Sequence, residues 1–324
     1  MKKIKTTFSW LKKYRKTIAI ILFISYMILS LFFIISYWNS IKDQIDLSAT
    51  KIQPQFLIYS FVFQTIGFFL STHIWQDVLR AYNLITDYWR NFRNYSYSLL
   101  STILPGKVLF HLGRMALYHN DGIDGRIVGV AGISEAILIG NGSLVLYTAC
   151  YFVYPDANLL INPWISVILA GATILTLTPP IFKKLVLWTN RSILRNKEII
   201  LVEYSLLKGI SWVVGEIIVV FLGGISLYLF LFTFVNIDNN QTLLIVAVWA
   251  AASASASFLF WLPGSFLVRD GAMLLVLQKI LPNVQLAFSI IILHRIWIII
   301  SITLFALIIW FIFDLSKNLK KNIN

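Results

Sequence analysis

The sequence predicts an all-α protein, a polytopic bundle of transmembrane helices, and three observations support this fold class. Hydrophobic residues fill 58% of the 324 positions and charged residues only 13%, and the mean hydropathy is +0.79. Seven apolar segments reach or approach the ~20 residues that a helix needs to cross a bilayer. Two regions contain a Leu-Pro-Gly break near ionised side chains. We expect one transmembrane domain at 17–313, between a basic cytoplasmic tail at 1–16 and a basic tail at 314–324.

The seven apolar segments are the predicted crossings, and aromatic residues mark several of their ends. They are Thr17–Trp38, Gln55–Trp75, Ile127–Tyr154, Trp164–Phe182, Ser211–Val235, Thr242–Trp261 and Leu286–Phe313. The first follows a basic stretch and so resembles a signal peptide. It is about 22 residues long, however, and no small-x-small cleavage pattern closes it. We expect it to be retained as the first helix.

Positive charges predict the orientation of the chain. Seven of the 27 basic residues lie in the first 16 positions. The loops at 76–94 and 183–210 are also rich in Lys and Arg, whereas those at 39–54, 155–163 and 236–241 are poor in them. The positive-inside rule therefore places the amino terminus and the two basic loops in the cytoplasm. The formal charge of +13 then belongs to the flanks of a cytoplasmic-membrane protein, and we expect no nucleic-acid partner.

Each Leu-Pro-Gly break predicts a re-entrant or half-helix element. The residues before the first break, 95–104, are too few to cross a bilayer. The region 96–118 must enter and leave on the cytoplasmic side if the loop charges are to agree. The region 262–282 leaves two topologies open. If it returns to the side it entered from, the chain crosses seven times; if it crosses, there are eight crossings and the basic tail is cytoplasmic. We favour eight.

The breaks also suggest an anion site. Proline favours the first turn of a helix, and glycine permits a tight approach before it. A helix that begins inside the membrane at Pro105-Gly106 or Pro263-Gly264 directs unpaired amide groups toward a cavity, with the positive end of its dipole. Such a site suits a phosphate. Two such helices in corresponding halves resemble the broken helices of transporters built from inverted repeats. Kinks in ordinary helices are the alternative.

Ionisable residues in or near the apolar segments form the candidate site. They are Lys107, Arg114, Glu135, Glu216, Arg269, Asp270 and Arg295. Each costs roughly 2.5–3.5 kcal/mol at mid-helix, so each should face a partner or a polar cavity. For Glu216 and Lys107 we favour snorkelling to an interface. Glu135 and Arg295 lie deeper, and for them a structural salt bridge and a role toward substrate stay equal alternatives.

Motifs of the common enzyme and metal sites are missing from the sequence. The four histidines have no close metal-ligand spacing, and there is no Gly-x-Ser-x-Gly elbow or phosphate-binding loop. We therefore expect no catalytic residues, no metal and no cofactor. The small residues of 250–257 (AAASASAS), like Gly125, Gly129 and Gly132, suit close helix packing. Cys150 lies in an apolar run and should pack there.

Two regions resemble the signatures of a known family. The stretches 96–123 (SYSLLSTILPGKVLFHLGRMALYHNDGI) and 132–140 (GISEAILIG) resemble the first signature of the lysylphosphatidylglycerol synthase transmembrane region, a flippase-like family of integral membrane proteins. The stretch 258–297 (FLFWLPGSFLVRDGAMLLVLQKILPNVQLAFSIIILHRIW) resembles its second signature. The resemblance implies a lipid headgroup site made of Pro105, Gly106, Arg114, Glu135, Pro263, Gly264, Arg269, Asp270 and Arg295.

The second region departs from the family pattern, which usually reads Pro-Gly-Gly-x-Gly-x-Arg-Glu. Ser265 and Leu267 replace glycines, and Asp270 replaces the glutamate, although the pair Arg269-Asp270 keeps its charges. The resemblance implies handling or translocation of anionic or polyprenyl-linked lipids. Some members add an aminoacyl transferase domain that makes lysyl-phosphatidylglycerol. This chain ends at Asn324, just after its last apolar segment, so we do not expect it to lysylate lipids by itself.

Together these features predict a membrane protein that binds and translocates an anionic phospholipid or a polyprenyl-phosphate-linked lipid. In this hypothesis Arg114 and Arg269 hold the phosphate, and Glu135 and Asp270 balance the arginines when the site is empty. One alternative is a membrane-embedded enzyme that modifies a lipid phosphate, with Glu135 or Asp270 as general base. Another is a non-transporting partner of a glycosyltransferase or lipid synthase. The oligomeric state is not predicted by the sequence.

Overall fold

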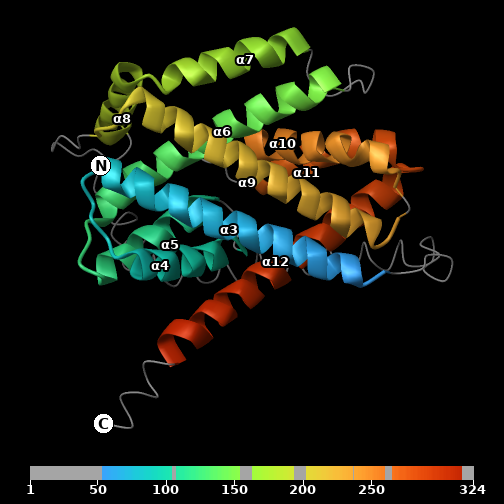
Figure 1. Cartoon of the computed structure of the whole chain (residues 1–324), viewed down its shortest axis with the longest axis horizontal. Helices are drawn as coiled ribbons and strands as arrows, with labels where there is room; N and C mark the ends of the chain where they lie inside the picture. Colours follow the sequence, from blue (N-terminus) through green and yellow to red (C-terminus); the bar gives the residue numbers. More distant parts are fainter. Residues whose placement is uncertain are drawn as a thin grey trace, which may run out of the picture. The chain divides into compact units, whose positions relative to one another are not determined.

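The computed structural model describes residues 53–103, 107–153, 163–192, 202–235, 237–259 and 265–315. Every regular element in these ranges is helical, which confirms the all-α class (Figure 1). The predicted crossing at 17–38 and the basic tail at 1–16 lie outside the described residues.

Four long helices are the main spans of the described part. They are α3 (Gln55–Ala81), α6 (Gly125–Val153), α9 (Leu206–Phe232) and α12 (Val284–Trp310). Each is long and apolar enough to cross a membrane, so the chain has the helices of a multi-pass membrane protein. Side chains cap the first turns of two of them: Ser205 precedes α9 and accepts from a backbone N–H of the helix, and Asn283 does the same at α12.

Four shorter helices accompany them. They are α4 (Tyr88–Leu100), α5 (Lys107–Asn120), α10 (Thr242–Phe258) and α11 (Ser265–Ile280). With 13 to 17 residues each, all are shorter than the ~20 residues of a full crossing. The helices α4 and α5 lie on either side of the first Leu-Pro-Gly break, and α10 and α11 lie on either side of the second, as the breaks predict. The break residues themselves lie outside the described ranges.

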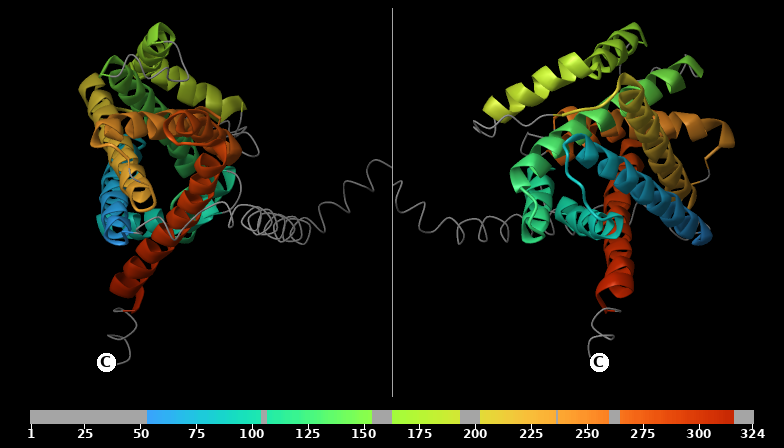
Figure 2. Two further views of the ribbon diagram at one scale, coloured as in Figure 1. Left: turned by 90° about the vertical axis from the view of Figure 1, so that its right-hand side faces the viewer. Right: turned by 60° about the vertical axis from the view of Figure 1, so that its left-hand side comes forward.

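The helices occur in the order long, short, short, long, and this order occurs twice. In the first set α3, α4, α5 and α6 have 27, 13, 14 and 29 residues. In the second α9, α10, α11 and α12 have 27, 17, 16 and 27 residues. The packing is reciprocal, because α4 of the first set contacts α12 of the second, and α10 of the second contacts α6 of the first (Figures 1 and 2).

The two sets meet along α3 and α9, which lie side by side and antiparallel (Figure 1). Near one end the N–H of Gln53 donates to the carbonyl of Thr233, and at the other the N–H of Glu203 donates to the carbonyl of Ala81. Ser60 and Ser226 exchange hydrogen bonds between hydroxyl and carbonyl, both at 2.9 Å. These hydrogen bonds within apolar sequence fix the register of α3 against α9, because a bilayer interior offers no water as an alternative partner for either serine.

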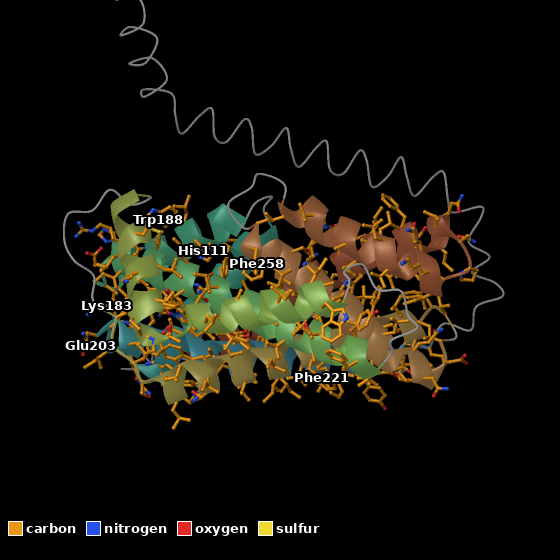
Figure 3. The ribbon with its side chains drawn as sticks, turned by 90° about the horizontal axis from the view of Figure 1, so that it is seen from above. His111, Lys183, Trp188, Glu203, Phe221 and Phe258 are labelled. Atoms are coloured by element: carbon orange, nitrogen blue, oxygen red, sulfur yellow. The ribbon has the colours of Figure 1, made fainter. Side chains whose placement is uncertain are left out.

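Two helices between the sets differ from the prediction. The segment Trp164–Phe182 is not one straight span, because α7 (Pro163–Thr176) and α8 (Pro179–Ser192) are bent by 82°. Pro179 and Pro180 at the start of α8 have no N–H to donate, so the helix cannot run through them. The predicted loop at 183–210 is also wrong at both ends, because 183–192 belong to α8 and 206–210 to α9. Figure 3 places Lys183, Trp188 and Glu203 toward the same end of the bundle.

Small residues let the helices of the core approach each other, as the sequence predicts. A Cβ atom added at Gly132 of α6 would lie 2.6 Å from Nδ1 of His111 on α5, and one at Gly129 would lie 3.0 Å from the sulfur of Met115. The alanines of 250–257 are buried or partly buried against α6 and α9. Of the four long helices α6 is the most enclosed, with 61% of its apolar window buried. It therefore sits at the centre of the helices that carry the site.

Candidate functional site

Arg114 of α5 and Glu135 of α6 form a buried ion pair. Nη1 of Arg114 lies 2.5 Å from Oε2 of Glu135, and the side chains are 1% and 3% exposed. Each charge is deep inside the described fold, where an unpaired ion would be very costly. The arginine and the glutamate that the sequence predicts to balance each other after the first break are therefore in direct contact.

Aromatic rings surround the guanidinium of Arg114. Its Cζ lies 4.2 Å from the ring centroid of Trp75, 4.6 Å from that of Tyr95 and 4.2 Å from that of Phe110. Its Nε donates to the Ser98 hydroxyl at 3.3 Å, but its Nη2 is buried with no hydrogen-bond partner among the described residues. The rings stabilise the cation through their negative faces. The free N–H groups leave donor capacity that a single carboxylate does not use.

A second charged cluster joins α11 to α12. Asp270 lies 3.3 Å from Nε of Arg269 and 2.7 Å from Nη2 of Arg295. These three side chains are 17% to 28% exposed, so this cluster is more open than the first. Two guanidinium groups thus contact one carboxylate. The ring centroid of Trp249, on α10, lies 5.8 Å from Cζ of Arg269.

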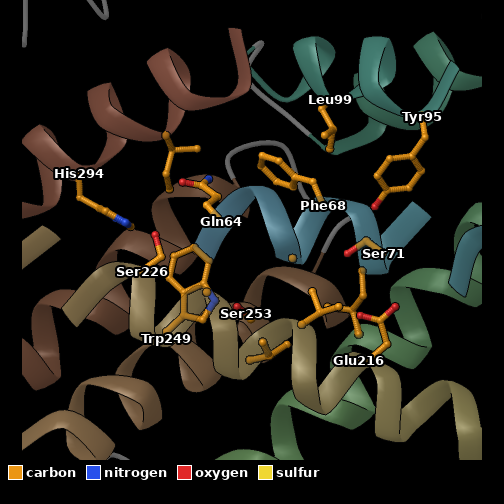
Figure 4. Close-up of a pocket in the computed structure, with 16 residues that line it drawn as sticks. Gln64, Phe68, Ser71, Tyr95, Leu99, Glu216, Ser226, Trp249, Ser253 and His294 are labelled. Carbon is orange, nitrogen blue, oxygen red and sulfur yellow. The ribbon is translucent and has the colours of Figure 1, made fainter. Parts of the chain in front are cut away.

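A cavity of about 190 Å³ is lined by side chains that contact both clusters. Glu216 and Tyr95 lie toward one end of it, and Trp249 and His294 toward the other (Figure 4). Tyr95 stacks on Arg114, and Trp249 is the ring beside Arg269. The lining comes from α3, α4, α6, α9, α10 and α12, so both sets of four helices build the cavity.

Polar groups are scattered over the mainly apolar wall. They are Gln64, Ser71, Tyr95, Glu216, Ser226, Trp249, Ser253 and His294. Glycine opens the space at one point: a Cβ atom at Gly223 would lie 2.2 Å from the indole nitrogen of Trp249, so only glycine admits this ring. His294 is 3% exposed and packs between two aromatic rings. The centroid of its imidazole lies 5.1 Å from the ring centroid of Phe230 and 5.6 Å from that of Trp249.

Glu216 corrects one expectation from the sequence. Its predicted snorkelling to an interface is wrong, because the residue is 1% exposed and faces the cavity from α9. The reason is the close approach of α6: a Cβ atom at Gly142 would lie 2.9 Å from that of Glu216. Its Oε2 atom has no hydrogen-bond partner among the described residues.

The structure thus assembles most of the predicted charged residues, in two groups rather than one. Arg114 meets Glu135, and Asp270 meets both Arg269 and Arg295. The half-helices α5 and α11 are not packed on each other; α5 packs on α4 and α6, and α11 on α10 and α12. Pro105, Gly106, Pro263 and Gly264 lie outside the described residues, as does the side chain of Lys107.

Sequence reasoning missed Tyr95, Trp249 and His294, which connect the groups; Glu216 was among the ionisable candidates, but its position in the cavity wall was not predicted. His294 directly precedes Arg295 in the chain, which is the one local hint that was present. Within the described ranges, no group of three or more His, Cys, Asp or Glu side chains is placed to hold a metal ion.

Comparison with known proteins adds no family to this picture. No family model matches the chain, and no curated protein matches it either.

Proposed function

We propose that this chain binds the phosphate headgroup of a membrane lipid and translocates it across the cytoplasmic membrane. The lipid would be an anionic phospholipid or a polyprenyl-phosphate-linked lipid. The observation that carries the proposal is the single cavity whose wall touches both arginine clusters, through Tyr95 on Arg114 and Trp249 beside Arg269. The arginines do not line the cavity themselves; each lies behind an aromatic residue of its wall. A cationic group near each end of one cavity suits a headgroup that is passed from one to the other.

Exchange of anions is the proposed chemistry. In the empty protein Glu135 balances Arg114, and Asp270 balances Arg269 and Arg295. A phosphate offers oxygens in the geometry that a guanidinium fork recognises, so it can replace a carboxylate without leaving the cation bare. The unpartnered Nη2 of Arg114 gives the phosphate a donor that Glu135 does not occupy. Binding then requires little new charge separation within the membrane.

The apolar part of the lipid would stay in the bilayer. Exposed apolar side chains line the long helices, for example Ile58 at 63% and Val62 at 45% on α3, and Leu307 at 53% on α12. Such surface is costly in water and neutral against acyl chains. The headgroup can therefore move through the polar cavity while the tails remain in contact with lipid.

The repeated helix order supports a two-repeat topology of this kind. If α3–α6 and α9–α12 are inverted repeats, each pair of short helices is a re-entrant hairpin. The chain would then cross six times, at 17–38, α3, α6, the α7–α8 pair, α9 and α12, and the basic tail would be cytoplasmic. This count is lower than the seven or eight expected from the sequence, because α10 becomes one arm of a hairpin.

The resemblance to the flippase-like lysylphosphatidylglycerol synthase region points the same way. Arg114 with Glu135, and Asp270 with Arg295, are residues that the two signatures share with this chain, and each pair is in contact. The replacement of a glutamate by Asp270 keeps the carboxylate that pairs with the arginines.

Transport of a fluorescent phosphatidylglycerol in reconstituted vesicles tests the proposal. Arg114→Gln and Arg269→Gln should each lower the rate at least tenfold. Arg126→Gln is the matched control, because Arg126 is an exposed arginine that pairs with Asp124 in the turn before α6. Circular dichroism and gel filtration of each variant establish folding. Wild-type rates in both Arg114→Gln and Arg269→Gln would overturn the proposal.

Two further readouts separate the alternatives. Chemical change of the lipid in detergent micelles, where there are no two sides, would indicate an enzyme. Co-purification of a soluble transferase or synthase without lipid movement would indicate a non-transporting partner.

A further inference from the structure

Glu216 is a buried acid that neither arginine cluster uses. It lies on α9, is 1% exposed, lines the cavity, and has one carboxyl oxygen without a hydrogen-bond partner among the described residues. The side chain is held there by close packing, since α6 approaches it at Gly142 without room for a Cβ atom. A polar atom kept unsatisfied in such a place indicates a group that binds something in another state.

The charges around Glu216 do not balance if it is ionised. Glu135 on α6 is near enough for the two carboxylates to repel, and it is already paired with Arg114. One guanidinium would then serve two carboxylates. Tyr95 faces the same end of the cavity from α4, and a phenol does not supply positive charge.

Among the described residues, the other elements packed on α9 place no substitute cation beside Glu216. On α3, His73 lies beside the Tyr88 ring and Asp77 pairs with Lys208, an exposed residue at the start of α9. From α10, Ser253 lines the cavity, and from α12, His294 does so at the far end (Figure 4). No neighbouring side chain in the described ranges neutralises an ionised Glu216, so a species that enters through the cavity must do so.

A proton fits this position better than a metal ion. Metal cations of biological sites require several oxygen ligands around them. No hydroxyl or amide of the described residues lies within hydrogen-bond distance of Oε2 of Glu216. A proton needs only the carboxylate oxygen itself.

We infer that Glu216 holds a proton more tightly when a lipid phosphate occupies the cavity, so that phosphate entry draws a proton from the aqueous phase at pH values where the ligand-free protein leaves Glu216 ionised, and phosphate exit releases it. The step is the conversion of the Glu216 carboxylate to the neutral acid, with no other bond made or broken. The inference rests on the proposed function, because the phosphate on Arg114 is the charge that drives uptake. By linkage, protonated Glu216 favours the bound phosphate as much as the phosphate favours the proton.

This linkage determines how phosphate affinity changes with pH. Ionised Glu216 repels a phosphate anion, so phosphate binding is strongest at low pH and weakens as the pH rises through the titration of this residue. With one proton coupled, the weakening approaches about tenfold per pH unit. The substitution Glu216→Gln keeps the shape and removes the charge, so this variant should bind strongly at all pH values.

The test measures binding of short-chain phosphatidylglycerol to the purified full-length protein in detergent, from about pH 5 to about pH 9. A phosphodiester keeps one negative charge over this range, so the ligand itself does not titrate. Wild-type protein should lose affinity as the pH rises, and Glu216→Gln should not. Glu203→Gln is the matched control, because Glu203 is an exposed glutamate just before α9, and it should behave as wild type.

A second measurement keeps the test decisive if Glu216→Gln does not fold. In weakly buffered solution, wild-type protein should take up protons when phosphatidylglycerol is added, and Arg114→Gln should not. Binding to wild type that is independent of pH, or that takes up no protons, would overturn the inference and leave the proposed function standing. Absence of binding to wild type at every pH would instead contradict the proposed function.

Discussion

Arg114 and Glu135 form an ion pair at 2.5 Å in which neither side chain is more than 3% exposed. Three rings cover the guanidinium, and one of its nitrogens has no partner among the described residues. A buried pair of this kind contributes little net stability compared with apolar residues of the same size, but breaking it is costly. The proposed function accounts for this pair in an apolar core by a ligand that takes the place of Glu135.

The substitution Glu135→Gln separates the contribution of Glu135 to stability from its competition with a ligand for Arg114. The variant leaves a buried guanidinium without its carboxylate, so the free protein should lose about 3–5 kcal/mol of stability. Phosphatidylglycerol should restore more of the lost stability than it adds to wild type, because the phosphate then meets no competitor. The unfolding midpoint in detergent, with and without this lipid, measures both effects.

Glu203→Gln changes an exposed glutamate and is the control. Its unfolding midpoints with and without the lipid should equal those of wild type. Unchanged stability of Glu135→Gln, or equal stabilisation of variant and wild type by the lipid, would show that Glu135 does not compete with the phosphate.

The contact of Gly142 with Glu216 makes a second prediction. In Gly142→Ala the new methyl would lie 2.9 Å from the Cβ atom of Glu216 and 3.0 Å from the backbone nitrogen of Ile217. Backbone cannot yield cheaply, so we expect a loss of about 1–3 kcal/mol. Gly171→Ala on α7 is the matched control, since no atom lies within 4 Å of its added Cβ atom. It should be neutral or stabilising by about 0.5–1 kcal/mol, because alanine favours a helix. Equal midpoints for the two variants would contradict the close α6–α9 packing.

The fold was predictable where composition and helix breakers determine it. Four apolar segments became α3, α6, α9 and α12, because a run of that length and hydropathy satisfies its own backbone in a bilayer. The sharp bend between α7 and α8 was also encoded, by Pro179 and Pro180, but the hydropathy of the segment concealed it. Hydropathy averages over a window and so does not register a missing N–H.

The candidate site was predictable only in part. Arg114, Glu135, Arg269, Asp270 and Arg295 stood out because ionisable residues are rare in apolar sequence. The pairing of Asp270 with Arg295 requires α11 to fold back on α12, which spacing alone does not specify. Tyr95 and Trp249 resemble ordinary aromatic residues, since a cavity wall is assembled from helices far apart in the chain. The burial of Glu216 depends on Gly142, which is 74 positions earlier.

The side of the basic tail tests the two-repeat topology. Ile323→Cys, in a Cys150→Ala background, should resist a membrane-impermeant maleimide in intact cells and react after permeabilisation. Asp238→Cys, between α9 and α10, should react in intact cells, because the proposed topology places this turn outside. Cys150 is buried, so its replacement removes only a background thiol. Labelling of Ile323→Cys in intact cells would contradict a cytoplasmic tail and the six crossings.

The most direct test of the headgroup site is the identity of the lipid that remains bound after purification in mild detergent. Mass spectrometry of the extracted lipid should find a phosphate-bearing species enriched on wild type over the host membrane. The double variant Arg114→Gln/Arg269→Gln should lose that enrichment, and Arg126→Gln should retain it. Enrichment of a lipid without phosphate, or equal enrichment in the double variant, would contradict the account.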